Sequence, residues 1–148
     1  MATRYAPRKL GLDDLVKVLA DEHAAMRAAL QRVEAAAKAG DFDGVSRALK
    51  ELDPVFRQHI ADEEATVLGF LIGALGVKGA ESEILVFRQH RPIYQLMQKV
   101  GELASRSAAE LSSSQSELEA LFEEHTGSEE RLVFPKALRL HAGELTRG

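Results

Sequence analysis

The sequence predicts an all-α protein, an antiparallel up-down four-helix bundle. Hydrophobic residues recur at alternating gaps of four and three through most of the chain, as they do in helices that pack together. No stretch shows the alternation of hydrophobic and polar residues that is typical of a strand. The chain has 148 residues, and 45% are hydrophobic. We therefore expect a single domain over 1–148, with a core at about 12–140 and an N-terminal tail at 1–10.

The first two helices are defined by their inward-facing positions. The first places Leu12, Val16, Leu19, His23, Met26, Leu30, Val33 and Ala37 on one face, and Gly40 ends it. The second places Val45, Leu49, Leu52, Phe56, His59, Glu63, Val67 and Phe70 on one face. Between Glu63 and Val67 the gap is four where three is due. Gly73, Gly76 and Gly79 then interrupt the pattern.

The third and fourth helices follow the same rhythm. The third runs roughly over 82–108 and turns Phe87, His90, Tyr94, Met97 and Ala104 inward. The fourth carries Leu111, Leu118, Phe122, His125, Glu129 and Leu132 on its inner face. Its start is marked by Ser114-x-x-Glu117, which has the spacing of a capping box.

Two prolines interrupt this regular picture. Proline inside a helix removes a hydrogen bond and kinks the helix. Pro54 and Pro92 are therefore interpreted as loop boundaries or ordinary kinks, and Pro54 can also begin a separate helical segment. A second interpretation is that Pro92 opens the bundle near its core for ligand access.

Composition excludes several classes of function. There is no cysteine, which rules out disulfides, iron–sulfur clusters and thiolate zinc sites. The net charge of −4 argues against a nucleic-acid partner. The longest hydrophobic run, Ala65–Val77, is too short to cross a membrane, and the N-terminus lacks the core of a signal peptide. We expect a cytoplasmic protein with no membrane partner. The segment Val67–Val77 packs in its own bundle or forms a dimer surface, so monomer and homodimer both stay open.

Two stretches of the chain repeat one pattern. FRQHIADEEATV at 56–67 and FEEHTGSEERLV at 122–133 both read Phe-x-x-His-x-x-x-Glu-Glu-x-x-Val. His59 and His125 lie 66 positions apart, and His23 and His90 lie 67 apart. A spacing of four places a histidine and a glutamate on the same helical face. The chain is thus an imperfect repeat, which predicts a pseudo-twofold axis with two facing half-sites.

Polar residues occupy positions that the helical pattern assigns to the core. They are His23, His59, Glu63, His90, His125 and Glu129. A buried carboxylate without a partner is strongly unfavourable, and a metal ion would compensate it. Two carboxylates able to bridge and four imidazoles suit two ions better than one. A metal-free His–Glu network and a single ion such as zinc remain alternatives. Glu64 and Glu130 are expected outside the ligand set, and His141 on the surface.

At these residues the sequence resembles the hemerythrin-like, or HHE cation-binding, family. Its pattern is a histidine, His-x-x-x-Glu, a histidine and a second His-x-x-x-Glu on four successive helices. Here HIADE and HTGSE supply the two paired motifs, and EERLVFPKAL resembles the usual ending of the family. The resemblance implies two iron ions bridged by both carboxylates and an oxo or hydroxo group. Manganese and zinc accept the same ligands.

The resemblance fails at one position of the third helix. Oxygen-carrying hemerythrins have His-x-x-x-His there, whereas HRPIY places Tyr94 where the second histidine would be. Tyr94 is a core aromatic with its hydroxyl satisfied, a phenolate ligand, or a donor beside a water ligand. The equivalent position on the first helix is Arg27, which can pair with a carboxylate.

These observations lead to a functional hypothesis with alternatives. We expect a di-iron protein that binds, senses or reacts with O2, NO or peroxide, or that senses iron. No substrate pocket or nucleophile is recognisable in the sequence, so an enzyme, here a slow oxidase or peroxidase, is an alternative. A bundle that uses metal only to stabilise its fold or that binds a partner is another.

Overall fold

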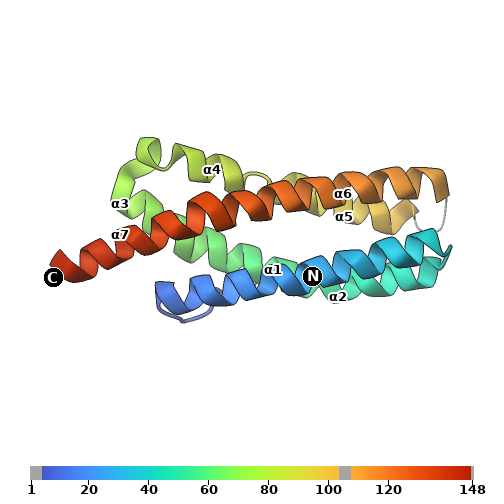
Figure 1. Ribbon diagram of the computed structural model, residues 1–148, viewed down its shortest axis with the longest axis horizontal. Coiled ribbons are helices and arrows are strands. Elements are labelled where there is room, and N and C mark those ends of the chain that lie inside the picture. Colours follow the sequence, from blue (N-terminus) through green and yellow to red (C-terminus); the bar gives the residue numbers. More distant parts are fainter. Residues whose placement is uncertain (1–4, 104–107, 148) are drawn as a thin grey trace.

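The computed structural model describes residues 5–103 and 108–147, and the described residues form helices without any strand (Figure 1). Four helices make up the bundle: α1 (Leu12–Lys38), α2 (Phe42–Asp62), α5 (His90–Leu103) and α6 (Ala108–Ser128). Helix α1 packs on α2 and α6, and α5 packs on α6 and α2. The prediction of an all-α helical bundle is confirmed.

Two of the four helices continue beyond a short π-helix. Helix α2 leads into η1 (Glu63–Leu68) and then α3 (Gly69–Gly79). Helix α6 leads into η2 (Glu129–Val133) and then α7 (Phe134–Arg147). The short helix α4 (Glu81–Phe87) joins α3 to α5. Figure 1 shows α3, α4 and α7 extending one end of the bundle.

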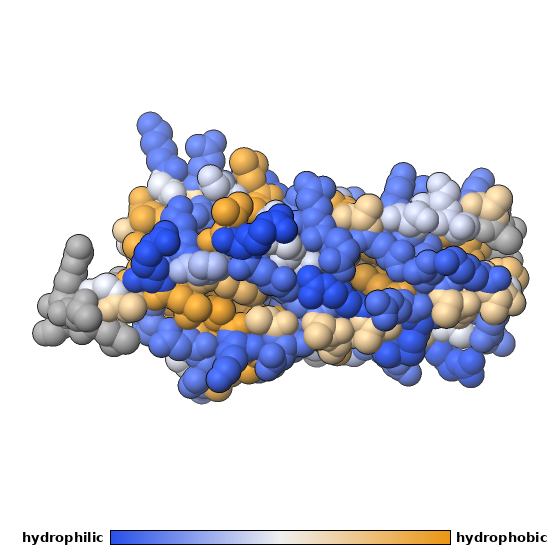
Figure 2. All heavy atoms as spheres, viewed as in Figure 1, coloured by the Kyte–Doolittle hydropathy of each residue, from blue (hydrophilic) through white to orange (hydrophobic). Residues whose placement is uncertain are grey.

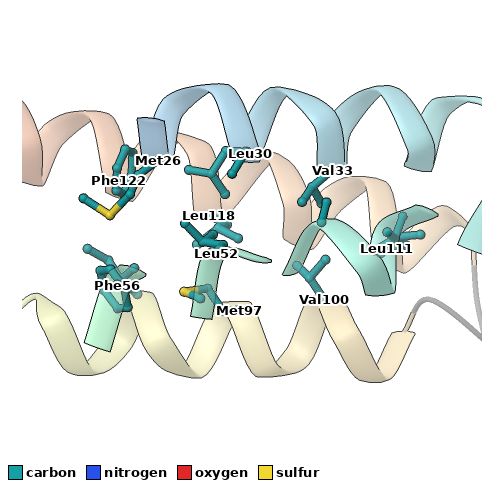
Figure 3. Packing of buried hydrophobic residues seen from close by; sticks show 14 residues of the cluster. Met26, Leu30, Val33, Leu52, Phe56, Met97, Val100, Leu111, Leu118 and Phe122 are labelled. Atoms are coloured by element: carbon teal, nitrogen blue, oxygen red, sulfur yellow. The ribbon is translucent and has the colours of Figure 1, made fainter. Parts of the chain in front are cut away.

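The interior contains two separate hydrophobic clusters. The first cluster includes Met26, Leu52, Phe56, Met97 and Leu118, and Figure 3 shows such side chains meeting from all four bundle helices. The second cluster lies toward α3 and α7 and is made of Leu12, Leu15, Val16, Leu19, Val67, Leu71, Ala80, Phe87, Val133, Phe134 and Ala137. Along α1, His23 falls between Leu19 of the second cluster and Met26 of the first. The polar inward residues therefore form a layer between two hydrophobic regions.

The π-helices change which residues face inward. Each π turn holds one residue more than an α turn, so the next inward residue comes one position later. Val133 is fully buried, whereas Leu132 is 62% exposed, so the expectation that Leu132 faces inward is wrong. In the same way Leu71 is fully buried and Phe70 is only half-buried. The gap of four between Glu63 and Val67 is the trace of the first π-helix in the sequence.

The helix expected over 82–108 is divided. Helix α4 ends at Phe87 and α5 begins at His90, with a turn at Arg88 and Gln89. Pro92 explains the break, because it has no N–H for the carbonyl of Arg88 and its ring clashes with that carbonyl. Pro54, by contrast, lies inside α2, so no separate helical segment begins there. The expected inward position Ala104 lies outside the described residues.

The fourth bundle helix begins earlier than the capping-box spacing predicts. Helix α6 starts at Ala108, and Ser114 is buried inside it. Ser114 and Gln115 occupy inward positions between Leu111 and Leu118, and the amide of Gln115 donates to the carbonyl of Leu30 at 3.3 Å. Ser114 is thus an interior residue of the helix and not its cap. Helix α1 ends at Lys38, and Gly40 follows with a φ of 70°. The prediction that the first helix ends at Gly40 is therefore confirmed.

Residues 5–11 lie alongside α1 and α2 (Figure 1). The backbone N–H of Arg8 donates to Asp62 at 2.7 Å, and the carbonyl of Ala6 accepts from Gln58 at 2.8 Å. The face in Figure 2 is mostly hydrophilic, with hydrophobic areas toward α3 and α7. Among the described residues, no helix has the length and hydrophobicity needed to cross a membrane.

Candidate metal centre

The polar layer brings six side chains together in two overlapping groups. His23 and His59 meet Glu63 and Glu129 in the first group, and His90 and His125 meet the same two glutamates in the second. Within each group the candidate ligand atoms all lie within 4.8 Å of one another, and every residue is buried. We call them the first group and the second group. Their histidine rings are paired, with centroids 4.9 Å apart in the first group and 4.7 Å in the second.

Glu63 lies between a histidine of each group. Its Oε1 is 3.0 Å from Nε2 of His59 and 3.1 Å from Nε2 of His90. Glu129 has the corresponding position, with Oε1 2.8 Å from Nε2 of His125 and 3.4 Å from Nε2 of His23. Each carboxylate therefore touches both groups, which is the position that a bridging ligand occupies.

All four histidines are held from outside through Nδ1. Each Nδ1 meets a side-chain oxygen: His23 meets Glu130 at 2.9 Å, His59 meets Glu22 at 3.1 Å, His90 meets Glu64 at 3.2 Å and His125 meets Gln89 at 3.0 Å. An Nδ1–H that donates to an oxygen leaves the lone pair on Nε2. In all four rings Nε2 is the atom directed to the interior, and Nε2 of His90 also forms a hydrogen bond with Oε1 of Glu63 at 3.1 Å. Metal-binding histidines in proteins are oriented in this way.

Several inward atoms are buried without a hydrogen bond. They are Nε2 of His23, His59 and His125, Oε2 of Glu63, and both carboxylate oxygens of Glu129. The short Nε2–Oε1 distance between His125 and Glu129 thus lacks hydrogen-bond geometry. Adjacent ligands of one ion, each about 2.1 Å from it, lie about 3 Å apart without bonding to each other. Because uncompensated buried polar atoms are costly, the residues present fit a bound cation.

Comparison with known proteins agrees with this geometry. Residues 1–71 match the family model of the hemerythrin HHE cation binding domain. This stretch of the chain is similar to that domain. The matched part includes His23, His59 and Glu63, while His90, His125 and Glu129 lie beyond it. No curated protein and no solved structure matches the chain.

The two π-helices begin at the two glutamates of the candidate metal centre. Glu63 is the first residue of η1, and Glu129 is the first residue of η2. In both cases the preceding α-helix contains the histidine of the His-x-x-x-Glu pair and ends at the residue before the glutamate. π turns inside α-helices occur frequently at functional sites, where they alter the direction of a side chain. Their local sequence signal is the displaced hydrophobic residue, Val67 or Val133.

Burial and neighbouring charges set the protonation of the centre without metal. Burial disfavours the charged form of His59, but attraction to Glu63 and hydrogen bonding to Glu22 prevail and raise its pKa to about 9. Burial, together with the charge of His90, lowers the pKa of His125 to about 3. Burial also opposes ionisation of Glu63, yet His59 and His90 hold its pKa well below the usual range. A proton therefore resides on His59, next to the ionised Glu63.

The remaining candidate residues lie outside the two groups. The hydroxyl of Tyr94 accepts a hydrogen bond from Arg57, so the structure shows Tyr94 as a half-buried aromatic with its hydroxyl satisfied. Arg27 pairs with Glu123 at 2.9 Å and with Glu130 at 3.2 Å. His141 is half-buried and contacts Asp13.

Sequence reasoning missed three residues that touch the histidines. Glu22 and Gln89 precede His23 and His90 in the chain but contact His59 and His125 on the neighbouring helices. The ring of Phe134 stacks on His23 with centroids 5.6 Å apart. Glu22 and Gln89 lie 67 positions apart, as His23 and His90 do. This shared spacing was the sequence feature that could have pointed to the two residues.

Proposed function

We propose that this chain is a non-haem di-iron protein that binds, senses or reacts with O2, NO or peroxide, or that senses iron. The two ions would be held by His23, His59, Glu63, His90, His125 and Glu129. A bound iron pair supplies redox chemistry toward small oxygen or nitrogen ligands. The protein side chains hold and orient the pair and keep bulk water away from it.

The observation that carries this proposal is the direction of the imidazole rings. Four buried rings are held at Nδ1 by outer oxygen atoms, and three of the inward Nε2 atoms have no hydrogen bond. Glu63 and Glu129 each belong to both groups, which favours two bridged ions over a single ion. A purely structural His–Glu network would instead satisfy its buried atoms internally.

We also infer that the bundle is an antiparallel up-down bundle with a pseudo-twofold axis through the centre. The contacts of Glu63 with His59 and His90 correspond to those of Glu129 with His125 and His23. The residue offsets are 66 and 67, as in the sequence repeat. This equivalence supports two half-sites of similar construction.

A groove between α1 and α7 supports the access of a small ligand. It has a volume of about 640 Å³ and is lined by Asp13, Asp14, Val16, Lys17, Ala20, Glu130, Phe134, Pro135 and Leu138. Glu130 and Phe134 line the groove and both touch His23, so these two side chains lie between the groove and the first group. Val16, Phe134 and Leu138 give the groove a hydrophobic part, which is compatible with entry of a small uncharged molecule.

Metal content tests the proposal most directly. Protein from iron-supplemented cells is expected to hold close to two iron ions per chain. His59→Ala should lose at least one of them and lower the thermal midpoint, while the matched variant His141→Ala should retain both. Metal-free protein that does not take up iron on reconstitution, with an unchanged midpoint in His59→Ala, would support the alternative of a metal-independent structural bundle.

Optical spectra test the reactivity. Anaerobic ferrous protein exposed to O2 should develop near-ultraviolet charge-transfer absorption. Repeated turnover of O2 or peroxide with iron retained would identify a slow oxidase or peroxidase, and a stoichiometric reaction would identify a carrier or sensor. An unchanged spectrum in fully iron-loaded protein would contradict O2 reactivity.

A further inference from the structure

The outer partners of the four histidines correspond through the repeat, except at one position. Glu130 on His23 corresponds to Glu64 on His90, with the offset of 66 that relates the two His-x-x-x-Glu motifs. Glu22 on His59 corresponds to Gln89 on His125, with the offset of 67. A charged carboxylate in the first group is therefore replaced by a neutral amide in the second.

The outer partners of the first group are themselves fixed. Arg8 donates through Nη2 to both oxygens of Glu22, at 2.9 and 3.0 Å, and through Nε to the fully buried Asp62 at 2.6 Å. Arg27 lies 3.2 Å from Glu130. Each carboxylate that holds a histidine of the first group is thus held by an arginine. The guanidinium fork restricts the orientation of the carboxylates it binds.

The outer partners of the second group are held less firmly. Gln89 lies in the turn between α4 and α5, where Pro92 breaks the helix. The side chain of Glu64 is 51% exposed. Within the described part of the chain, neither Gln89 nor Glu64 has an arginine partner like Arg8 or Arg27. The position equivalent to Arg27 is Tyr94, whose hydroxyl contacts Arg57 instead.

We propose that the two cation positions of the centre are unequal, with the ion at His23 and His59 bound tightly and the ion at His90 and His125 bound weakly, and that Glu22 and Gln89 set this difference. The inference rests on the proposed two-ion site. Glu22 and Gln89 are positioning residues, because they act on the metal only through His59 and His125.

The physical basis is the basicity and order of the imidazole ligands. A carboxylate that accepts the Nδ1–H makes Nε2 a better donor to the metal, whereas an amide oxygen does so much less. Loss of such an outer partner typically lowers metal affinity 10- to 100-fold.

Manganese titration measures the two affinities without redox chemistry. Mn²⁺ binds weakly among divalent first-row metals, so both dissociation constants are accessible to direct titration. Metal-free protein is titrated with Mn²⁺ while free ion is followed by electron paramagnetic resonance. The unsubstituted chain should bind two ions with dissociation constants that differ at least about 10-fold. His125→Ala should remove the weak class and retain the tight one.

Two substitutions of the positioning residues test their role in opposite directions. Glu22→Gln should weaken the tight class about 10-fold or more, and Gln89→Glu should strengthen the weak class by a similar factor. Glu51→Gln is the matched control, because Glu51 is exposed, lies outside both groups and pairs with Arg32 at 3.5 Å. Chelator extraction provides an independent readout. It should be biphasic in the unsubstituted chain and nearly monophasic in Gln89→Glu.

The outcomes separate this inference from the proposed function. Two ions bound with equal affinity, or two classes that do not respond to either substitution, would overturn the inference and leave the two-ion site intact. Loss of the tight class in His125→Ala would reverse the assignment and also overturn it. A chain that binds one ion or none would overturn the proposed function itself.

Discussion

Nε2 of His59 lies 3.0 Å from Oε1 of Glu63, at the residue where α2 becomes the π-helix η1. The same relationship occurs between His125 and Glu129 at the start of η2, with a distance of 2.8 Å. The pKa of His59 is raised to about 9, whereas that of His125 is lowered to about 3, so a metal ion would compete with a proton at Nε2 of His59. This competition makes the centre sensitive to pH.

Metal affinity should rise with pH. Binding requires a neutral imidazole, and Glu63 raises the pKa of His59 to about 9 in the metal-free protein. Displacing one proton makes affinity rise about tenfold per pH unit, up to about pH 9. Mn²⁺ titration at several pH values between about 6 and 8 measures the slope. His141→Ala should keep the slope, and an affinity independent of pH would contradict the protonation of His59.

The metal-free chain should be most stable near pH 6.5. Because the pKa of His59 is raised to about 9, its protonation stabilises the folded chain. This stabilisation is fully present below about pH 6.5 and is lost as pH rises through about 9. The lowered pKa of His125, about 3, means that below 6.5 the unfolded chain binds a proton that the folded chain does not, so stability falls toward acid. Thermal midpoints measured in chelator across this range should pass through a maximum. His59→Ala should flatten the alkaline side, and a midpoint that still falls there would assign the loss to another group.

The π-helical register predicts opposite results for two adjacent residues. Val133 is fully buried in the second hydrophobic cluster, so Val133→Ala should cost about 2 kcal/mol through lost burial and a cavity. Leu132 is 62% exposed, so Leu132→Ala should change stability by less than about 0.5 kcal/mol. Denaturant unfolding of the two variants measures both. The reverse order would show an α-helical register through this segment.

Tyr94 should not contribute to the spectrum of the iron-loaded protein. Its hydroxyl is engaged by Arg57, and the Arg57 guanidinium lies 5.2 Å from the centre of its ring. Tyr94→Phe should therefore keep the iron content and the electronic spectrum of the unsubstituted chain. A visible absorption band that disappears in Tyr94→Phe would identify a phenolate ligand and contradict this arrangement.

The sequence predicted the helices and the inward polar residues because both follow from local periodicity. His23, His59, Glu63, His90, His125 and Glu129 occur at inward spacings and are all buried in the structure. Their role as metal ligands stays a prediction that the metal titration tests. The local pattern gave wrong predictions at Ser114, which is not a helix cap, and at Leu132, which does not face inward. Ser114 is buried inside α6, and the extra residue of the π turn moves the inward position from Leu132 to Val133.

The sequence by itself determined the all-α bundle and the chemical types gathered along its inner faces, because side-chain direction in a helix follows from spacing alone. Only the tertiary structure decided which carboxylate lies between which histidines, and that Glu22 and Gln89 orient His59 and His125. These contacts join residues on different helices. Their geometry depends on how the helices pack, which no local spacing along the chain specifies.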